Sequence, residues 1–167
     1  MLRGYVRLFF FAAGLLFGIQ LPAFVIQYAQ RIDAHYLEVK QNFSGFQRTA
    51  DRHFGGDVAA MIRHHEQSGD VVFIEGGENI REIWQRLQHF TAERAALEAP
   101  LHWQLWHVVS NGDKEIIQET RNAYNYTVPL DLDAIIYGLI VGLLLALIYD
   151  LLVTLLRFTF FPHSKRV

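Results

Sequence analysis

Apolar residues gather near the two ends of the chain, and a polar middle part lies between them. The first apolar stretch runs from Leu8 to Gln30 and holds 23 residues without a charge. The second runs from Ala134 to Leu156, also 23 residues, with Asp150 as its one charge. A helix of this length extends about 34 Å, and a bilayer core is about 30 Å thick. The pattern therefore predicts two membrane-spanning helices.

A cleaved signal peptide is the alternative for the first stretch, because Arg3 and Arg7 precede its apolar run. The best cleavage tripeptide is Leu21-Pro22-Ala23, which fits the small-x-small rule poorly. Apolar residues also continue beyond this point. We therefore favour a first span that stays attached to the mature protein.

In the middle part, apolar positions recur every three or four residues, which indicates helices. Gly55-Gly56 should end the helix that leaves the first span, and Asp57 should cap the next one. The segment 70–75 is expected to be a loop, and Gly76-Gly77 should break the chain again. The expected helices cover residues 32–54, 58–67, 78–98, 101–109 and 113–124.

These elements predict an all-α protein, in which two transmembrane helices flank an extracytoplasmic bundle of about four helices. The expected divisions are an N-tail 1–7, spans 8–30 and 131–157, a middle domain 31–130 and a C-tail 158–167. The expected core of the middle domain contains Tyr36, Phe43, Phe46, Trp84, Leu87, Phe90, Trp103 and Trp106. An alternative for Leu101–Val109 is a place on the outer leaflet of the membrane, because tryptophan favours membrane interfaces.

The distribution of charge predicts the orientation in the membrane. Residues 1–7 and 157–167 carry basic side chains and no acid, whereas residues 31–130 carry 10 basic and 14 acidic residues. Because loops rich in Lys and Arg stay in the cytoplasm, both termini should be cytoplasmic and the middle domain should be external. The net charge of the whole chain is −2, which excludes general nucleic-acid binding.

The sequence contains no catalytic motif. The chain has no cysteine, which excludes disulfides, thiolate catalysis and iron–sulfur clusters. It contains no phosphate-binding loop, no G-x-S-x-G elbow and no H-E-x-x-H. His64 and His65 are adjacent, so on one regular helix they point about 100° apart and cannot chelate one ion together. We therefore expect no enzyme activity, no metal site and no cofactor.

The two spans carry the more informative signal, a G-x-x-x-G in each. Such pairs let helix backbones approach closely. Counted from the cytoplasmic side, the depths place Gly14 beside Gly142 and Gly18 beside Gly138 in an antiparallel hairpin. The same register brings Arg7 level with Asp150, and an intramembrane acid needs a partner. Arg3 and Arg157 are the other candidates for this ion pair, and a homodimer through the same glycines is the alternative to the hairpin.

The chain resembles a family of proteobacterial inner-membrane proteins known only as a domain of unknown function. The resemblance lies in the runs Gln20–Tyr28, Ala50–Asp57 and Tyr126–Asp131. It implies a Gram-negative inner membrane and two spans, and it carries no activity, cofactor or catalytic residue. Two kinds of function stay open: a scaffold that binds a protein partner or another copy of itself, and a periplasmic sensing or ligand-binding module that acts through a separate protein.

Overall fold

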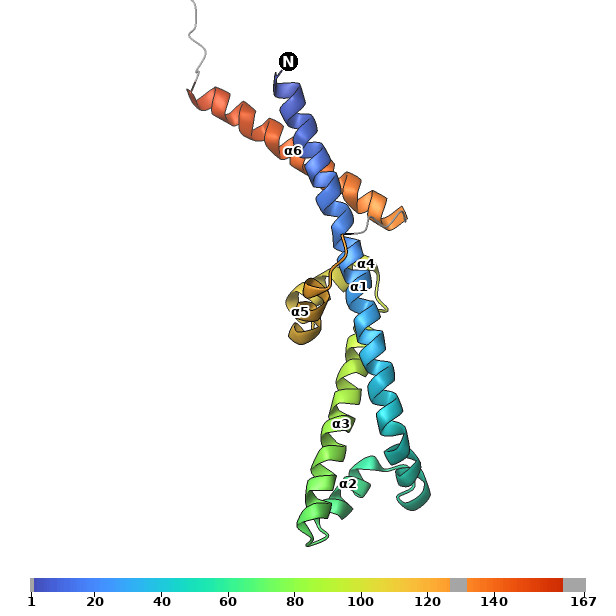
Figure 1. The fold of residues 1–167 in the computed structure, drawn as a ribbon. Coiled ribbons are helices and arrows are strands. Elements are labelled where there is room, and N and C mark those ends of the chain that lie inside the picture. Colours follow the sequence, from blue (N-terminus) through green and yellow to red (C-terminus); the bar gives the residue numbers. More distant parts are fainter. Residues whose placement is uncertain (1, 127–131, 161–167) are drawn as a thin grey trace, which may run out of the picture. The chain divides into compact units, whose positions relative to one another are not determined.

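The computed structural model describes residues 2–126 and 132–160, with the backbone alone at positions 157, 158 and 160. These residues form six α-helices and no strand, so the prediction of an all-helical fold is confirmed. The helices are α1 (Leu2–His53), α2 (Val58–Glu66), α3 (Val71–Ala96), α4 (Leu101–Ser110), α5 (Lys114–Asn122) and α6 (Leu132–Phe160), as Figure 1 shows.

The chain divides into two compact units. We call the first the hairpin unit; it combines the residues of α1 up to Ile26 with the residues from Ala123 onward. We call the second the helical unit; it contains Gln27–Asn122. Helix α1 is continuous and contributes to both, and Pro22 lies inside it with its side chain fully buried.

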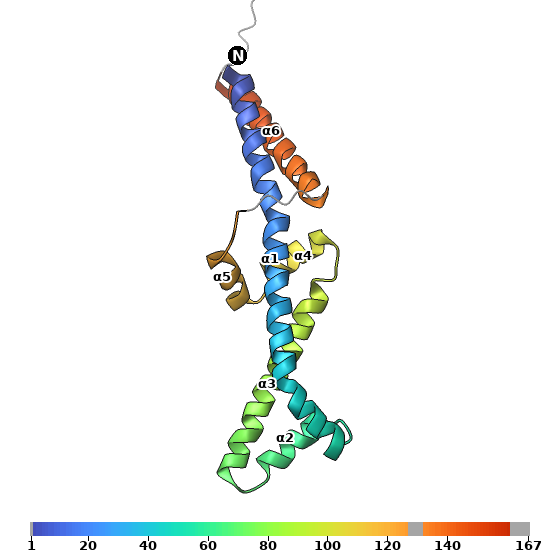
Figure 2. The ribbon, with the colours of Figure 1, turned by 45° about the vertical axis from the view of Figure 1, so that its right-hand side comes forward.

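In the hairpin unit, α6 lies beside the first half of α1 in both views (Figure 1 and Figure 2). Both helices are long and apolar enough to cross a membrane. In the most apolar 18-residue window of α6, 6% of the residues are buried, against 33% in that of α1. Most side chains of α6 therefore point away from α1.

In the helical unit, the core lies where α2 and α3 meet the end of α1. Its buried residues are Phe43, Ala50, Val58, Met61, Ile62 and Ile80, flanked by Phe46, Phe54, Ile83, Trp84 and Leu87. Phe90 is buried farther along α3, as expected. The prediction is wrong for Trp103 and Trp106, whose exposed fractions are 58% and 63%. These two side chains point outward on α4 because the inward positions of this short helix are occupied by others, such as Val108.

Two aspartates stabilise the first turns of α2 and α3. Asp57 accepts a hydrogen bond from the Ala60 N–H at 2.9 Å and caps α2, as expected. Asp70 caps α3 in the same way through the Val72 N–H. Gly69 lies between α2 and α3 with a φ of +76°, a conformation that glycine adopts without strain.

The prediction of a loop at 70–75 and of a break at Gly76-Gly77 is wrong, because α3 begins at Val71 and includes both glycines. The cap at Asp70 starts the helix earlier than its apolar pattern suggests. A glycine inside a helix destabilises it by about 1 kcal/mol relative to alanine. Gly77 nevertheless has a packing role, because a Cβ built there would lie 3.0 Å from the His65 Cβ on α2. The glycine allows α2 and α3 to approach closely.

Candidate functional site

The four glycines of the two G-x-x-x-G motifs lie at one contact between α1 and α6. A Cβ built on Gly14 would lie 2.9 Å from the Gly142 Cα, and one built on Gly18 would lie 2.9 Å from the Gly138 Cα. Real Cβ atoms essentially never come this close to another atom. The contact is therefore made by backbone atoms, and a larger side chain at any of these positions would push the helices apart.

Asp150 on α6 lies between two arginines of α1. Its Oδ1 accepts a hydrogen bond from the Arg3 Nη2 at 3.2 Å, and its Oδ2 lies 3.5 Å from the Arg7 Nη1. The two expected alternatives, Arg3 and Arg7, thus share one carboxylate. The side chain of Arg157, the third candidate, lies outside the described part of the chain. All three charged groups are partly exposed, so the geometry holds a charge cluster at a surface.

Tyr124 attaches the segment before α6 to α1, a contact that the sequence does not predict. Its hydroxyl donates to the Gln20 Oε1 at 2.6 Å, and its ring lies 5.6 Å from that of Phe24. Burial, followed by the effect of neighbouring Tyr126, raises the pKa of Tyr124. The hydroxyl therefore keeps its proton and remains a donor at neutral pH.

A buried polar network joins four helices of the helical unit. The Tyr28 hydroxyl donates to the Glu93 Oε2 at 2.7 Å and accepts a hydrogen bond from the Asp113 N–H at 2.8 Å. The Nε2 of His107 on α4 lies 3.0 Å from the same Glu93 oxygen. Tyr28 has no exposed surface, and Glu93 is only 7% exposed. The phenol of Tyr28 thus connects α1 to α3 and to the residue that caps α5, and Glu93 connects α3 to α4.

Asp113 extends this network toward the surface. Its Oδ1 accepts hydrogen bonds from the N–H groups of Glu115 and Ile116 and so caps α5, while its Oδ2 lies 2.7 Å from the Nε2 of His89. Burial alone would raise the pKa of Asp113, but the hydrogen bonds from Ile116, His89 and Glu115 outweigh it and lower the pKa. Asp113 is therefore ionised at neutral pH, which strengthens both the cap and its contact with His89.

The sequence contains one local signal of this network. Glu93 follows Phe90 by three residues, so it falls on the stripe of α3 that faces inward. A carboxylate on such a stripe needs buried partners. Its partners Tyr28 and His107 lie 65 and 14 positions from it in the sequence, and no local pattern connects them.

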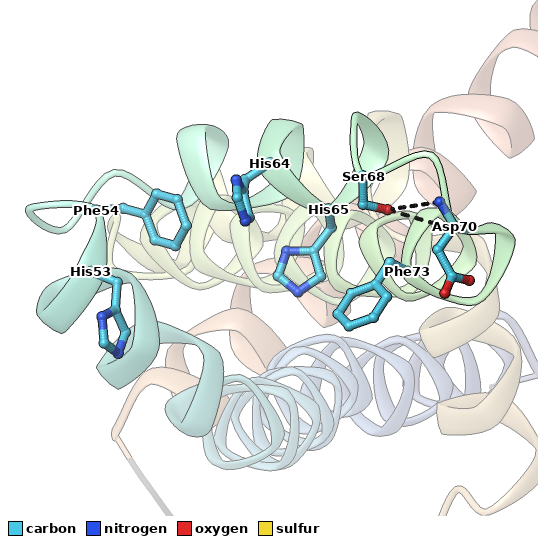
Figure 3. A pocket seen from close by; sticks show the side chains of 7 residues that line it. All are labelled: His53, Phe54, His64, His65, Ser68, Asp70 and Phe73. Carbon is cyan, nitrogen blue, oxygen red and sulfur yellow. Dashed lines mark hydrogen bonds between the residues drawn. The ribbon is translucent and has the colours of Figure 1, made fainter.

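Three histidines and two phenylalanines line a hollow at the other end of the helical unit. The hollow has a volume of about 590 Å³ (Figure 3). Its lining residues are His53, Phe54, His64, His65, Ser68, Asp70 and Phe73. The Nδ1 of His65 lies 2.9 Å from the Met61 carbonyl oxygen and donates to it. Within residues 2–126 and 132–160, no three His, Asp or Glu side chains are grouped so that they could hold a metal ion.

Comparison with known proteins gives a family and no function. Neither a curated protein nor a solved structure matches the chain. A family model described as "Protein of unknown function (DUF2937)" matches residues 2–161, which is nearly the whole sequence and includes the paired glycines, the charge cluster and the buried network. The chain therefore belongs to the DUF2937 family.

Proposed function

We propose that this chain is a non-enzymatic two-span protein of a Gram-negative inner membrane, whose external helical unit binds a protein partner. The observation that supports membrane insertion is the outward-facing apolar surface of α6. Its exposed large side chains include Leu139, Ile140, Leu143, Leu144, Leu147, Ile148, Leu151, Leu152, Leu155 and Leu156. Contiguous apolar surfaces of this extent are rare on proteins that face water, and lipid tails would cover this one.

The proposed orientation rests on the excess of basic residues near both ends of the chain. Alkaline phosphatase is active only outside the cytoplasm, so a fusion after Asn111 should be active. A fusion after Lys165 should be inactive. The reverse pattern would contradict the orientation, and intact mass of the extracted protein tests whether Met1–Ala23 stays attached.

The proposed partner surface is one face of α4. Trp103, Trp106 and Val109 are spaced by three residues and expose 58%, 63% and 82% of their surface. Exposed tryptophans frequently dominate the binding energy of protein interfaces. The helix contains no Asp, Glu, Lys or Arg, so a partner would remove no charge from water when it covers this face.

Affinity purification in mild detergent tests this surface. A protein that co-purifies at constant stoichiometry should be lost from the double variant Trp103→Ala/Trp106→Ala. It should be retained by Val71→Ser/Val72→Ser, which removes equally exposed apolar side chains from α3. A second copy of this chain as the captured protein would identify a homo-oligomer. Quenching of both tryptophans by lipid-phase quenchers would instead support the outer-leaflet alternative and contradict a protein partner.

The hollow around His65 favours the second candidate function, a ligand-binding or sensing module. Imidazole and phenyl rings surround it (Figure 3). The ring centres of Phe54 and His64 lie 5.6 Å apart, and those of Phe73 and His65 lie 6.0 Å apart. This lining suits a small ligand with an aromatic part. A small molecule retained by the purified protein and lost in His65→Ala would support this candidate over the scaffold.

A further inference from the structure

The charge cluster of the hairpin unit has one more positive than negative group. Arg3 and Arg7 approach different oxygens of Asp150, so both oxygens are occupied and one positive charge remains. The arginine side chains are 44% and 59% exposed. Each guanidinium has five N–H donors, so both have donors left for a further acceptor.

An apolar groove begins at this cluster. A hollow of about 340 Å³ between α1 and α6 has Gly4, Arg7 and Asp150 at its charged end. Its remaining lining is Leu8, Phe11, Leu143, Ala146 and Leu147. A second hollow of about 250 Å³ is lined by the two arginines, Gly4 and Asp150, and so adjoins the first. The hollow around the two arginines therefore continues into the apolar groove.

Gly4 keeps the mouth of this groove open. A Cβ built on it would have no heavy atom within 4 Å. The glycine is therefore not required for packing between the helices, unlike Gly14. A Cβ at position 4 would meet no atom, and a larger side chain there would extend into the space beside Arg7.

We propose that this groove binds one anionic phospholipid of the cytoplasmic leaflet, with its phosphate on Arg3 and Arg7 and one acyl chain along Leu8 and Phe11. A guanidinium binds phosphate through paired hydrogen bonds, and the single charge of a phosphodiester matches the unbalanced positive charge. From Gly4 to Phe11 the groove follows about 10 Å of helix, which suits a chain and not a small ion. This inference rests on the proposed membrane insertion, which places both arginines at the headgroups.

The test uses the full chain in detergent micelles and native mass spectrometry. The probes are dioctanoyl phosphatidylglycerol, the phosphatidylcholine with the same chains, and inorganic phosphate. The wild type should bind phosphatidylglycerol roughly fivefold or more tightly than phosphatidylcholine, the effect of about one unpaired arginine. Equal binding of the two lipids would overturn the proposal, and so would inorganic phosphate that competes as well as the lipid.

Three variants test the groove itself. Gly4→Leu should abolish the preference, whereas Gly76→Leu, at another helical glycine with open space around it, should keep it. Asp150→Asn should strengthen phosphatidylglycerol binding, a gain that misfolding does not produce. An unchanged preference in Gly4→Leu, or weaker binding in Asp150→Asn, would overturn the site. Extraction of membranes with carbonate tests insertion separately: a released wild type contradicts the proposed function, whereas a retained wild type without lipid preference contradicts only this inference.

Discussion

The hairpin unit and the helical unit both consist of helices, but the contacts between the helices differ. Backbone atoms make them in the hairpin unit, and side chains make them in the helical unit. In the hairpin unit, glycine backbones meet between α1 and α6, and the leucines of α6 point outward. In the helical unit, side chains such as Met61 and Ile62 fill a core, and aspartates cap the helix ends. This difference agrees with the proposal that the hairpin unit packs in lipid and the helical unit in water.

The largest expected effect comes from truncating the core of the helical unit. Met61 has no exposed surface, so Met61→Ala should lower the free energy of unfolding by about 3 kcal/mol. The matched change in the hairpin unit, Leu151→Ala, removes a side chain that is 60% exposed and should change it by less than about 0.5 kcal/mol. Thermal unfolding in detergent measures both. Equal losses would contradict the contrast between the two units.

Replacing a glycine with a larger residue should destabilise the hairpin unit, which side-chain truncation leaves almost unchanged. Gly14→Ile forces a branched side chain against the Gly142 backbone and should lower stability by about 2 kcal/mol. Gly4→Ile, on the same helix but in open space, should have little effect. Because the chain has no native thiol, cysteines at 14 and 142 can report the contact by crosslinking within one chain. Crosslinks between two chains at position 14 would indicate a homodimer instead.

Removing one hydroxyl should weaken the helical unit. Tyr28→Phe removes the hydrogen bond of the Asp113 N–H and one of the two contacts of Glu93, which keeps His107, and should lower stability by about 1.5 kcal/mol. Tyr36→Phe is the control, since Tyr36 is only partly buried and makes ring contacts with Arg94 and Lys40. Hydrogen exchange should speed up around α5 in the first variant alone. Unchanged protection there would mean that Tyr28 does not join the helices.

The charge cluster should contribute less, because its groups are partly exposed. Arg7→Leu alone leaves Arg3 on Asp150, so we expect a loss of about 0.5 kcal/mol. Replacing both arginines by leucine should cost more than the sum of the single changes, since Asp150 then has no partner in α1. Asp150→Leu added to that double variant should recover part of the loss. Strict additivity of the two arginine changes would show that they do not share the carboxylate.

The smallest expected effect is on the stability of the protein at acid pH. Because the pKa of Asp113 is lowered on folding, its ionised form stabilises the protein above the unfolded pKa of about 3.9. This contribution is lost as the pH falls through the lower, folded pKa. Asp113→Asn should therefore flatten part of the decrease in stability below about pH 4, as measured by circular dichroism. An unaltered acid profile would contradict the role of Asp113.

Features that depend on spacing along one segment are predictable from the sequence. Both apolar helices, the end of α1 before Gly55 and the cap at Asp57 follow from local pattern. The pairing of Gly14 with Gly142 also follows, because the charges at the ends of the two apolar segments set the register of an antiparallel hairpin. The local pattern does not predict that Gly77 lies inside a helix or that Trp106 is exposed. Both depend on which neighbouring helix packs against the residue. The network at Tyr28 depends on residues far apart in the sequence and needs the tertiary structure.

The charge cluster also selects among alternative alignments of the hairpin. Glycines spaced by four allow α6 to slide along α1 by four residues, about 6 Å, and still match one glycine with another. In the observed alignment, Gly14 faces Gly142, and position 150 faces position 6, between Arg3 and Arg7. A slide in either direction moves Asp150 opposite position 2 or position 10, where it no longer lies between two arginines. The glycines thus permit several alignments of α6 along α1, and the carboxylate of Asp150 selects the observed one.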